Sequence, residues 1–148
     1  MADRFVDDYL HYLLARASSD VSAQFHARLR DRGLQVPEWR VLATLSDGDG
    51  RRLGELAAIT LQHQPTMTKI VDRMEKAGLV VRRQGAEDRR EVRIHITAEG
   101  RRRVDAALED AKAHEAEVLS GYDAPEKERL KDMLRTLIAR NGERPDRA

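Results

Sequence analysis

Between residues 62 and 103 the sequence places side chains that can hydrogen-bond to bases and phosphates, first on a helix and then on a loop. A glutamine can pair with adenine through two hydrogen bonds, a threonine can pack on a thymine methyl group, and a lysine reaches guanine or phosphate. A helix predicted to run from Pro65 to Lys76 has its apolar residues on one face at about 100° per residue. Its opposite face carries Pro65, Thr68, Lys69, Asp72 and Lys76, flanked by Gln64, Thr66 and Arg73.

The second group of candidate residues lies in the loop from Gln84 to Glu91, which is too long for a two-residue hairpin turn and is charged at its tip. Arg89 and Arg90 suit a narrow, electronegative minor groove, and Asp88 is near enough in sequence to orient one of their guanidinium groups. A solvated basic hairpin without a nucleic-acid partner is the alternative interpretation of this loop.

The charges of the chain are segregated although the 148 residues carry a net charge of only +1. Residues 62–103 hold 11 basic and 6 acidic side chains, whereas residues 1–61 hold 8 and 9, and residues 104–148 hold 8 and 11. A basic middle third between acidic flanks favours a module that binds a polyanion, and an unevenly charged surface is the alternative.

Composition excludes several classes of function. The absence of cysteine removes thiol catalysis, cysteine-based metal centres and thiol redox switches. The five histidines form no HxxxH or HxH pair, so we expect neither a metal site nor a cofactor. No apolar run approaches 18 residues, and the first nine residues contain no apolar signal core, so we expect a cytoplasmic protein without a membrane partner.

The elements that must position the candidate residues follow in a recognisable order. Val36-Pro37 opens a helix, Leu53–Thr60 forms a short helix, and the helix from Pro65 is stopped by Gly78. Two strands follow, Leu79–Arg83 and Val92–Ile96, the second with strict period-2 alternation. Helix, short helix, helix and hairpin is the order of a winged helix-turn-helix, so we predict a mostly α fold of the α+β type.

Long helices are predicted at both ends of the chain, and both carry apolar stripes that the winged module does not bury. The first runs without interruption from Phe5 to Asp31. Thr97 caps a helix with apolar residues to Tyr122, and Asp123 opens the last one. We therefore predict a two-fold dimer with an interface from Phe5–Leu14 and Leu130–Ile138. The predicted domains are 1–36 for dimerisation, 37–96 for DNA binding and 97–148 for dimerisation.

These motifs resemble the MarR family of bacterial transcriptional regulators. The similarity is carried by VPEWRVLATL, by LGELAAITLQHQPTMTKIVDRMEKAGLVVRR, and by EDRR followed by HITAEG. It implies that Gln64, Pro65, Thr66, Thr68, Lys69 and Arg73 lie in the DNA-reading helix, and that Asp88 and Arg90 form the Asp-x-Arg motif of the wing, with Arg89 between them. Leu61 and His63 stand where many members have Gly and then Ser or Asp.

The resemblance also implies a homodimeric repressor that binds an inverted-repeat operator in double-stranded DNA and is released by a small-molecule effector, often an aromatic carboxylate or its thioester. Arg16, beside Tyr12 on the first helix, is a candidate carboxylate anchor, and Trp39 is a candidate wall. The alternatives are a surface arginine packed along the core and a core tryptophan.

Other classes of function have less support in the residues. A winged-helix module that binds proteins remains the alternative, although such a module has no need of the wing arginines. There is no GxSxG, P-loop, GxGxxG or HExxH motif, so we predict that the chain is not an enzyme. RNA binding is disfavoured because residues 62–103 contain no aromatic side chain that could stack on bases.

Overall fold

The computed structural model describes residues 4–142, so the first three residues of the predicted N-terminal segment and the last six of the C-terminal segment lie outside it. The chain forms two compact units, Met1–Lys112 and Ala113–Ala148. The elements are α1 (Phe5–Asp8), α2 (Leu10–Asp31), α3 (Val36–Asp47), β1 (Arg51–Arg52), α4 (Leu53–Ile59), α5 (Gln64–Lys76), β2 (Val80–Gln84), β3 (Val92–Ile96), α6 (Ala98–Val118) and α7 (Ala124–Gly142).

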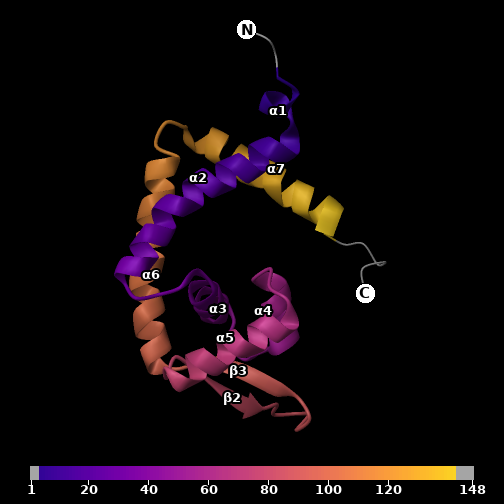
Figure 1. Ribbon diagram of the computed structural model, residues 1–148, viewed down its shortest axis with the longest axis vertical. Coiled ribbons are helices and arrows are strands. Elements are labelled where there is room, and N and C mark those ends of the chain that lie inside the picture. Colours follow the sequence, from indigo (N-terminus) through magenta and orange to yellow (C-terminus); the bar gives the residue numbers. More distant parts are fainter. Residues whose placement is uncertain (1–3, 143–148) are drawn as a thin grey trace. The chain divides into compact units, whose positions relative to one another are not determined.

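A winged helix-turn-helix lies within the first unit, as the order of the elements predicts (Figure 1). Helices α3, α4 and α5 pack beside a three-stranded antiparallel sheet of order β1-β3-β2. In the register of the hairpin, Val80 lies opposite Ile96 and Gln84 lies opposite Val92. The core is formed by Leu29, Leu34, Val41, Leu42, Leu45, Leu56, Ala57, Met67, Ile70, Val71, Met74, Leu79, Val80, Ile94, Ile96, Val104 and Ala107.

The strand β1 is absent from the sequence-based prediction, which has only a two-stranded hairpin. Arg51 and Arg52 pair with β3, and a strand of two arginines is too short to show any periodicity. The turn before it is fixed from a distance, because the Arg93 guanidinium donates to the Gly50 carbonyl at 2.8 Å. Gly50 has φ 71°, and a Cβ there would lie 2.8 Å from the His95 ring, so this turn requires glycine.

The prediction of one continuous helix from Phe5 to Asp31 is wrong at Tyr9, which separates α1 from α2 with an extended backbone (φ −81°, ψ 119°). The Tyr9 ring stacks on Phe5 with 4.9 Å between ring centroids. Asp7 and Asp8 directly precede the N-terminus of α2, where the helix dipole favours negative charge. Periodicity alone does not reveal this break, because apolar residues continue at helical spacing through it.

The caps of the two C-terminal helices follow the sequence signals. The Gly100 N–H donates to the Thr97 hydroxyl at 3.0 Å, which confirms the predicted cap of α6. At the start of α7 the Glu126 N–H donates to the Asp123 carboxylate at 2.8 Å, and the Asp123 N–H donates to the Glu126 carboxylate at 3.3 Å. This is the predicted capping box. Tyr122, expected within the first of these helices, lies beyond its end at Val118.

The turn between α4 and α5 is made by Leu61 in a left-handed conformation with φ 59°. The Gln62 N–H donates to the Ala57 carbonyl at 2.9 Å, so Leu61 occupies the position after a helix where glycine is usual. A left-handed conformation costs a residue with a Cβ roughly 1–2 kcal/mol. The Leu61 side chain is 84% exposed and recovers none of this cost by burial.

We predict that Leu61→Gly stabilises the chain by up to about 1 kcal/mol, because relief of roughly 1–2 kcal/mol of backbone strain exceeds the greater unfolded-state entropy of glycine. The melting temperature is expected to rise by about 2–4 °C. Leu61→Ala is the matched control, since it shortens the side chain but keeps the Cβ and therefore the strain. Equal melting temperatures for the two variants would contradict this explanation of the turn.

Candidate nucleic-acid interface

The inner face of α5 is fully buried, and this fixes the face that the helix turns to solvent. Met67, Ile70, Val71 and Met74 are each at most 3% exposed. The opposite face carries Gln64, Pro65, Thr66, Lys69 and Arg73 as exposed residues, with Thr68 half-buried. The predicted DNA-reading residues therefore share one outward surface.

The N-terminus of α5 has no side-chain cap. His63 occupies the cap position without a hydrogen bond from its side chain, and Pro65 lies in the first turn, where no N–H is required. The Thr68 hydroxyl donates to the Gln64 carbonyl at 3.1 Å, which leaves its oxygen free to accept. Residues Thr66, Lys69, Ile70, Asp72 and Arg73 line a shallow hollow next to this end of the helix.

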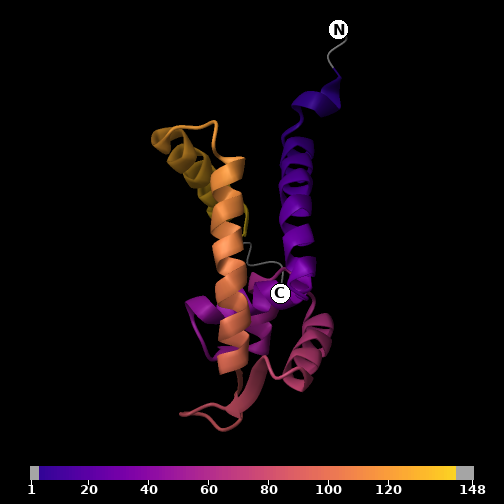
Figure 2. The ribbon, with the colours of Figure 1, turned by 90° about the vertical axis from the view of Figure 1, so that its left-hand side faces the viewer.

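We call the winged helix-turn-helix from α3 to β3 the lobe, and its strands β2 and β3 with the loop between them the wing. The loop of the wing extends away from the helices of the lobe (Figure 2). Its tip is shaped by Asp88, whose carboxylate accepts the Arg90 N–H at 2.9 Å. The expectation that Asp88 orients an arginine guanidinium is wrong, because within residues 4–142 its carboxylate forms no ion pair with Arg89 or Arg90 and binds this backbone N–H. The Gly85 N–H donates to the Glu91 carbonyl at 2.8 Å, and a Cβ on Gly85 would lie 2.6 Å from the Asp88 carbonyl oxygen.

Several arginines of the lobe are held in ion pairs with carboxylates of other residues. Glu91 pairs with Arg93 at 3.0 Å and with Arg52 at 3.4 Å, which joins the base of the wing to β1. Arg82 pairs with Asp72 at 2.5 Å and with Glu75 at 2.8 Å. Hydrogen bonds from the Arg82 backbone N–H and guanidinium hold the pKa of Glu75 below its ordinary value.

A second set of cations is exposed and, within residues 4–142, makes no ion pair shorter than 4 Å. These cations lie on α5, on β2 and at the tip of the wing. They are Lys69, Arg73, Lys76, Arg83, Arg89 and Arg90. Arg83 was not among the residues predicted from the sequence to bind DNA. Neighbouring residues of a strand point to opposite faces, so Arg82 and Arg83 cannot lie on the same surface, and this alternation is the signal that could have identified Arg83.

The candidate effector residues are brought together only in part. The Arg16 guanidinium donates to the Asp20 carboxylate at 2.8 Å and to the Tyr12 hydroxyl at 3.3 Å on the exposed surface of α2. Trp39 lies against the core, with its ring at the edge of Phe25 and 5.2 Å between centroids. Among the described residues no hydrogen bond or ring contact joins Trp39 to the other two.

The described part of the chain contains no cluster of three or more His, Asp or Glu side chains that could hold a metal ion. None of its helices is both long and apolar enough to span a bilayer.

Comparison with known proteins places these features in one family. A sequence model of the MarR family matches residues 32–91. The HTH-type transcriptional repressor Rv2887 of Mycobacterium tuberculosis is 31% identical over 131 residues, which cover 88% of this chain and 94% of the relative.

Solved structures agree over nearly the full length. The MarR family regulator SPO1453 of Silicibacter pomeroyi is 45% identical with a TM-score of 0.83, covering 93% of this chain and 98% of that protein. CouR of Rhodococcus jostii, solved with p-coumaroyl-CoA, is 27% identical with a TM-score of 0.82 and covers 91% of this chain and 95% of its own. The chain belongs to the MarR family of transcriptional regulators.

Proposed function

We propose that this chain is a homodimeric transcriptional repressor that binds double-stranded DNA, is released by a small effector and has no catalytic role. The proposal rests on the exposed cations of α5 and of the wing that pair with no described carboxylate. Helix α5 enters the major groove, and the wing reaches the adjacent minor groove. The contact residues in this proposal are Gln64, Pro65, Thr66, Thr68, Lys69, Arg73, Asp88, Arg89 and Arg90.

Their chemistry assigns different tasks to these residues. The Gln64 amide offers a donor and an acceptor to a base edge, whereas the ammonium group of Lys69 offers a charge to phosphate. Asp88 acts through the loop, because its hydrogen bond to the Arg90 N–H fixes the backbone that carries both wing arginines. In support, the transcriptional repressor CouR has been solved bound to a 23-mer DNA duplex, and its structure matches this chain with a TM-score of 0.79.

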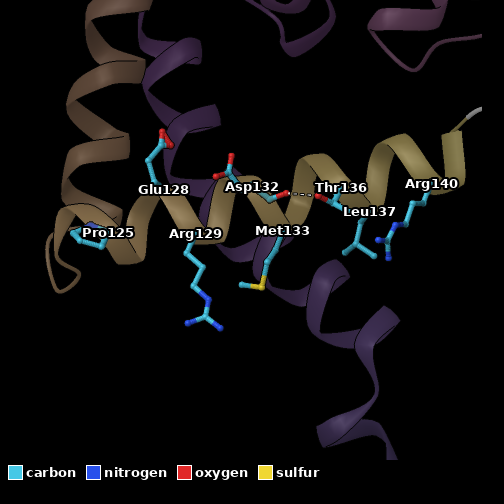
Figure 3. A pocket seen from close by; sticks show the side chains of 8 residues that line it. All are labelled: Pro125, Glu128, Arg129, Asp132, Met133, Thr136, Leu137 and Arg140. Atoms are coloured by element: carbon cyan, nitrogen blue, oxygen red, sulfur yellow. Dashed lines mark hydrogen bonds between the residues drawn. The ribbon is translucent and has the colours of Figure 1, made fainter.

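The homodimer is supported by apolar side chains that the single chain leaves exposed. On α1 and α2 these include Phe5 at 74% and Leu10 at 55%, and on α7 they include Met133 at 52% and Ile138 at 69%. On one side of α7, Met133 and Leu137 lie between Arg129 and Arg140, and all four side chains point in the same direction (Figure 3). A two-fold axis between two chains places their recognition helices about 34–36 Å apart, which calls for an inverted-repeat operator.

The effector is an aromatic carboxylate or its thioester, with Arg16 as the anion partner, Tyr12 beside it and Trp39 as an apolar wall. Rv2887 has been solved with salicylic acid, and CouR with p-coumaroyl-CoA. In the free chain the Arg16 guanidinium is paired with the Asp20 carboxylate. The carboxylate of an effector can take the place of Asp20 at this guanidinium.

Arg90→Ala tests the DNA-binding role of the wing. We expect the variant to lose about 1–3 kcal/mol of affinity for a duplex that the wild-type protein enriches from a random-sequence pool, with unchanged melting. Arg30→Ala on α2 removes the same charge from an exposed residue outside the lobe and outside the proposed dimer interface, and serves as control. Fluorescence anisotropy over a range of salt concentrations measures the DNA affinity of both variants and of the wild type. If the logarithm of the wild-type affinity does not change with the logarithm of the salt concentration, phosphate contacts are excluded.

Ile138→Asp tests the dimer. A buried charge without a partner opposes association, so we expect sedimentation to show monomers at micromolar concentration where the wild type is dimeric. Ala139→Asp adds the same charge about 100° further round α7, away from the apolar seam, and is expected to stay dimeric. If both variants sediment as the wild type does, this seam is not the interface.

Arg16→Ala tests the effector site with salicylate as the probe. Loss of a hydrogen bond to a charged group is worth about 1.5–3 kcal/mol, so the salicylate concentration that releases half of the DNA is expected to rise at least tenfold. Arg30→Ala removes an exposed charge near the other end of the same helix as control. If salicylate releases DNA from the two variants at the same concentration, Arg16 is not part of the site. If salicylate releases no DNA from the wild type, it is not a ligand.

A further inference from the structure

One ion-pair network joins the recognition helix to the wing. From β2, Arg82 directs its guanidinium to two carboxylates of α5, Asp72 at 2.5 Å and Glu75 at 2.8 Å. The Arg82 backbone N–H also donates to Glu75 at 3.0 Å. Three hydrogen bonds therefore link a strand of the wing to two successive turns of α5.

The network is unusual in the partners it selects. Asp72 lies three residues after Lys69 and four before Lys76, so pairing within α5 is the simplest expectation for a surface helix. Instead the two carboxylates meet Arg82, which is only 29% exposed, whereas Asp72 is 50% exposed. In consequence the ammonium groups of Lys69 and Lys76 form no ion pair with these carboxylates and can bind an external anion.

The remaining connection between α5 and the wing is short. Helix α5 ends at Lys76, Gly78 with a φ of 76° then reverses the chain, and β2 begins two residues after this glycine. The Thr97 hydroxyl donates to the Gly78 carbonyl at 2.6 Å, which holds the corner at the C-terminal end of the helix. Asp72 lies about one turn further from this corner than Glu75 does. Its bond to Arg82 therefore resists rotation of α5 about the corner at Gly78.

We infer that Arg82 is a positioning residue, which holds α5 and the wing in the one relative orientation that lets both contact the same duplex. This inference rests on the proposed DNA binding. Phosphate contacts tolerate small displacements, whereas contacts to base edges do not. Loss of the bridge therefore lowers the preference for the operator over random DNA, and a mere loss of charge lowers the affinity for both.

Two variants break the bridge with opposite changes of charge. Arg82→Met removes one positive charge, and Asp72→Ala combined with Glu75→Ala removes two negative charges. If Arg82 positions the helix, we expect both variants to lose about tenfold in the ratio of operator to random-duplex affinity. If it supplies charge alone, Arg82→Met weakens binding to both duplexes, the double variant strengthens it, and the ratio stays constant, which would overturn the inference.

Arg102→Met is the matched control. Arg102 is an arginine of the same unit whose ion pair with Glu99 lies within α6 and joins no two elements. We expect this variant to keep the wild-type affinity ratio. The operator in all measurements is the duplex that the wild-type protein enriches from a random-sequence pool.

A second measurement does not depend on DNA. The chain has no cysteine, so spin labels can be placed through Thr66→Cys on α5 and Ala86→Cys on the wing. We expect the distance distribution between the labels to broaden in both bridge variants and not in Arg102→Met. An unchanged distribution would overturn the positioning role even if the affinities change. If the wild type enriches no duplex, the proposed function fails, and the label distances still decide the role of Arg82.

Discussion

Burial of one face of α5 is the constraint on which the candidate interface depends. Met67, Ile70, Val71 and Met74 each lose almost all contact with solvent, and burial of such a side chain is worth about 1.5–3 kcal/mol. Rotation of the helix about its axis would expose them, so the axis and the outward face are fixed together. Burial of these four side chains turns the opposite face of α5, with Gln64, Thr66 and Lys69, toward solvent. The orientation of the proposed base-reading face therefore depends first on a hydrophobic core.

Electrostatics then divides the basic residues of the lobe into two sets. Arg52, Arg82 and Arg93 are bound to carboxylates and join β1, the wing and α5 to one another. The guanidinium groups of Arg89 and Arg90, at the tip of the wing, form no ion pair with a described carboxylate. The same residue type thus forms a brace between elements in one place and leaves an exposed charge without an ion pair in another. The position of the carboxylates, and not the count of arginines, determines which surface is electropositive.

Features whose partners are close in sequence could be predicted, and features with distant partners could not. The cap at Thr97 and the capping box of Asp123 and Glu126 bond over three residues, and the strand Val92–Ile96 shows its own alternation. The strand β1 depends on β3, about 40 residues away, and has no pattern of its own. In the candidate site, periodicity predicted the outward face of α5. The partner of Arg82 was hidden, because a surface helix with alternating charges suggests pairs within itself.

Helix α2 joins the proposed effector residue Arg16 to the DNA-binding lobe. Its 22 residues form a rod of about 33 Å, with Arg16 and Tyr12 in the N-terminal half. At the other end Leu29 is buried in the core, and Arg32 and Arg28 bind the carboxylate and the carbonyl of Asp110 on α6. Because Leu29 at its C-terminal end lies in the same hydrophobic core as the buried face of α5, α2 connects the proposed effector residues to the recognition helix through direct packing.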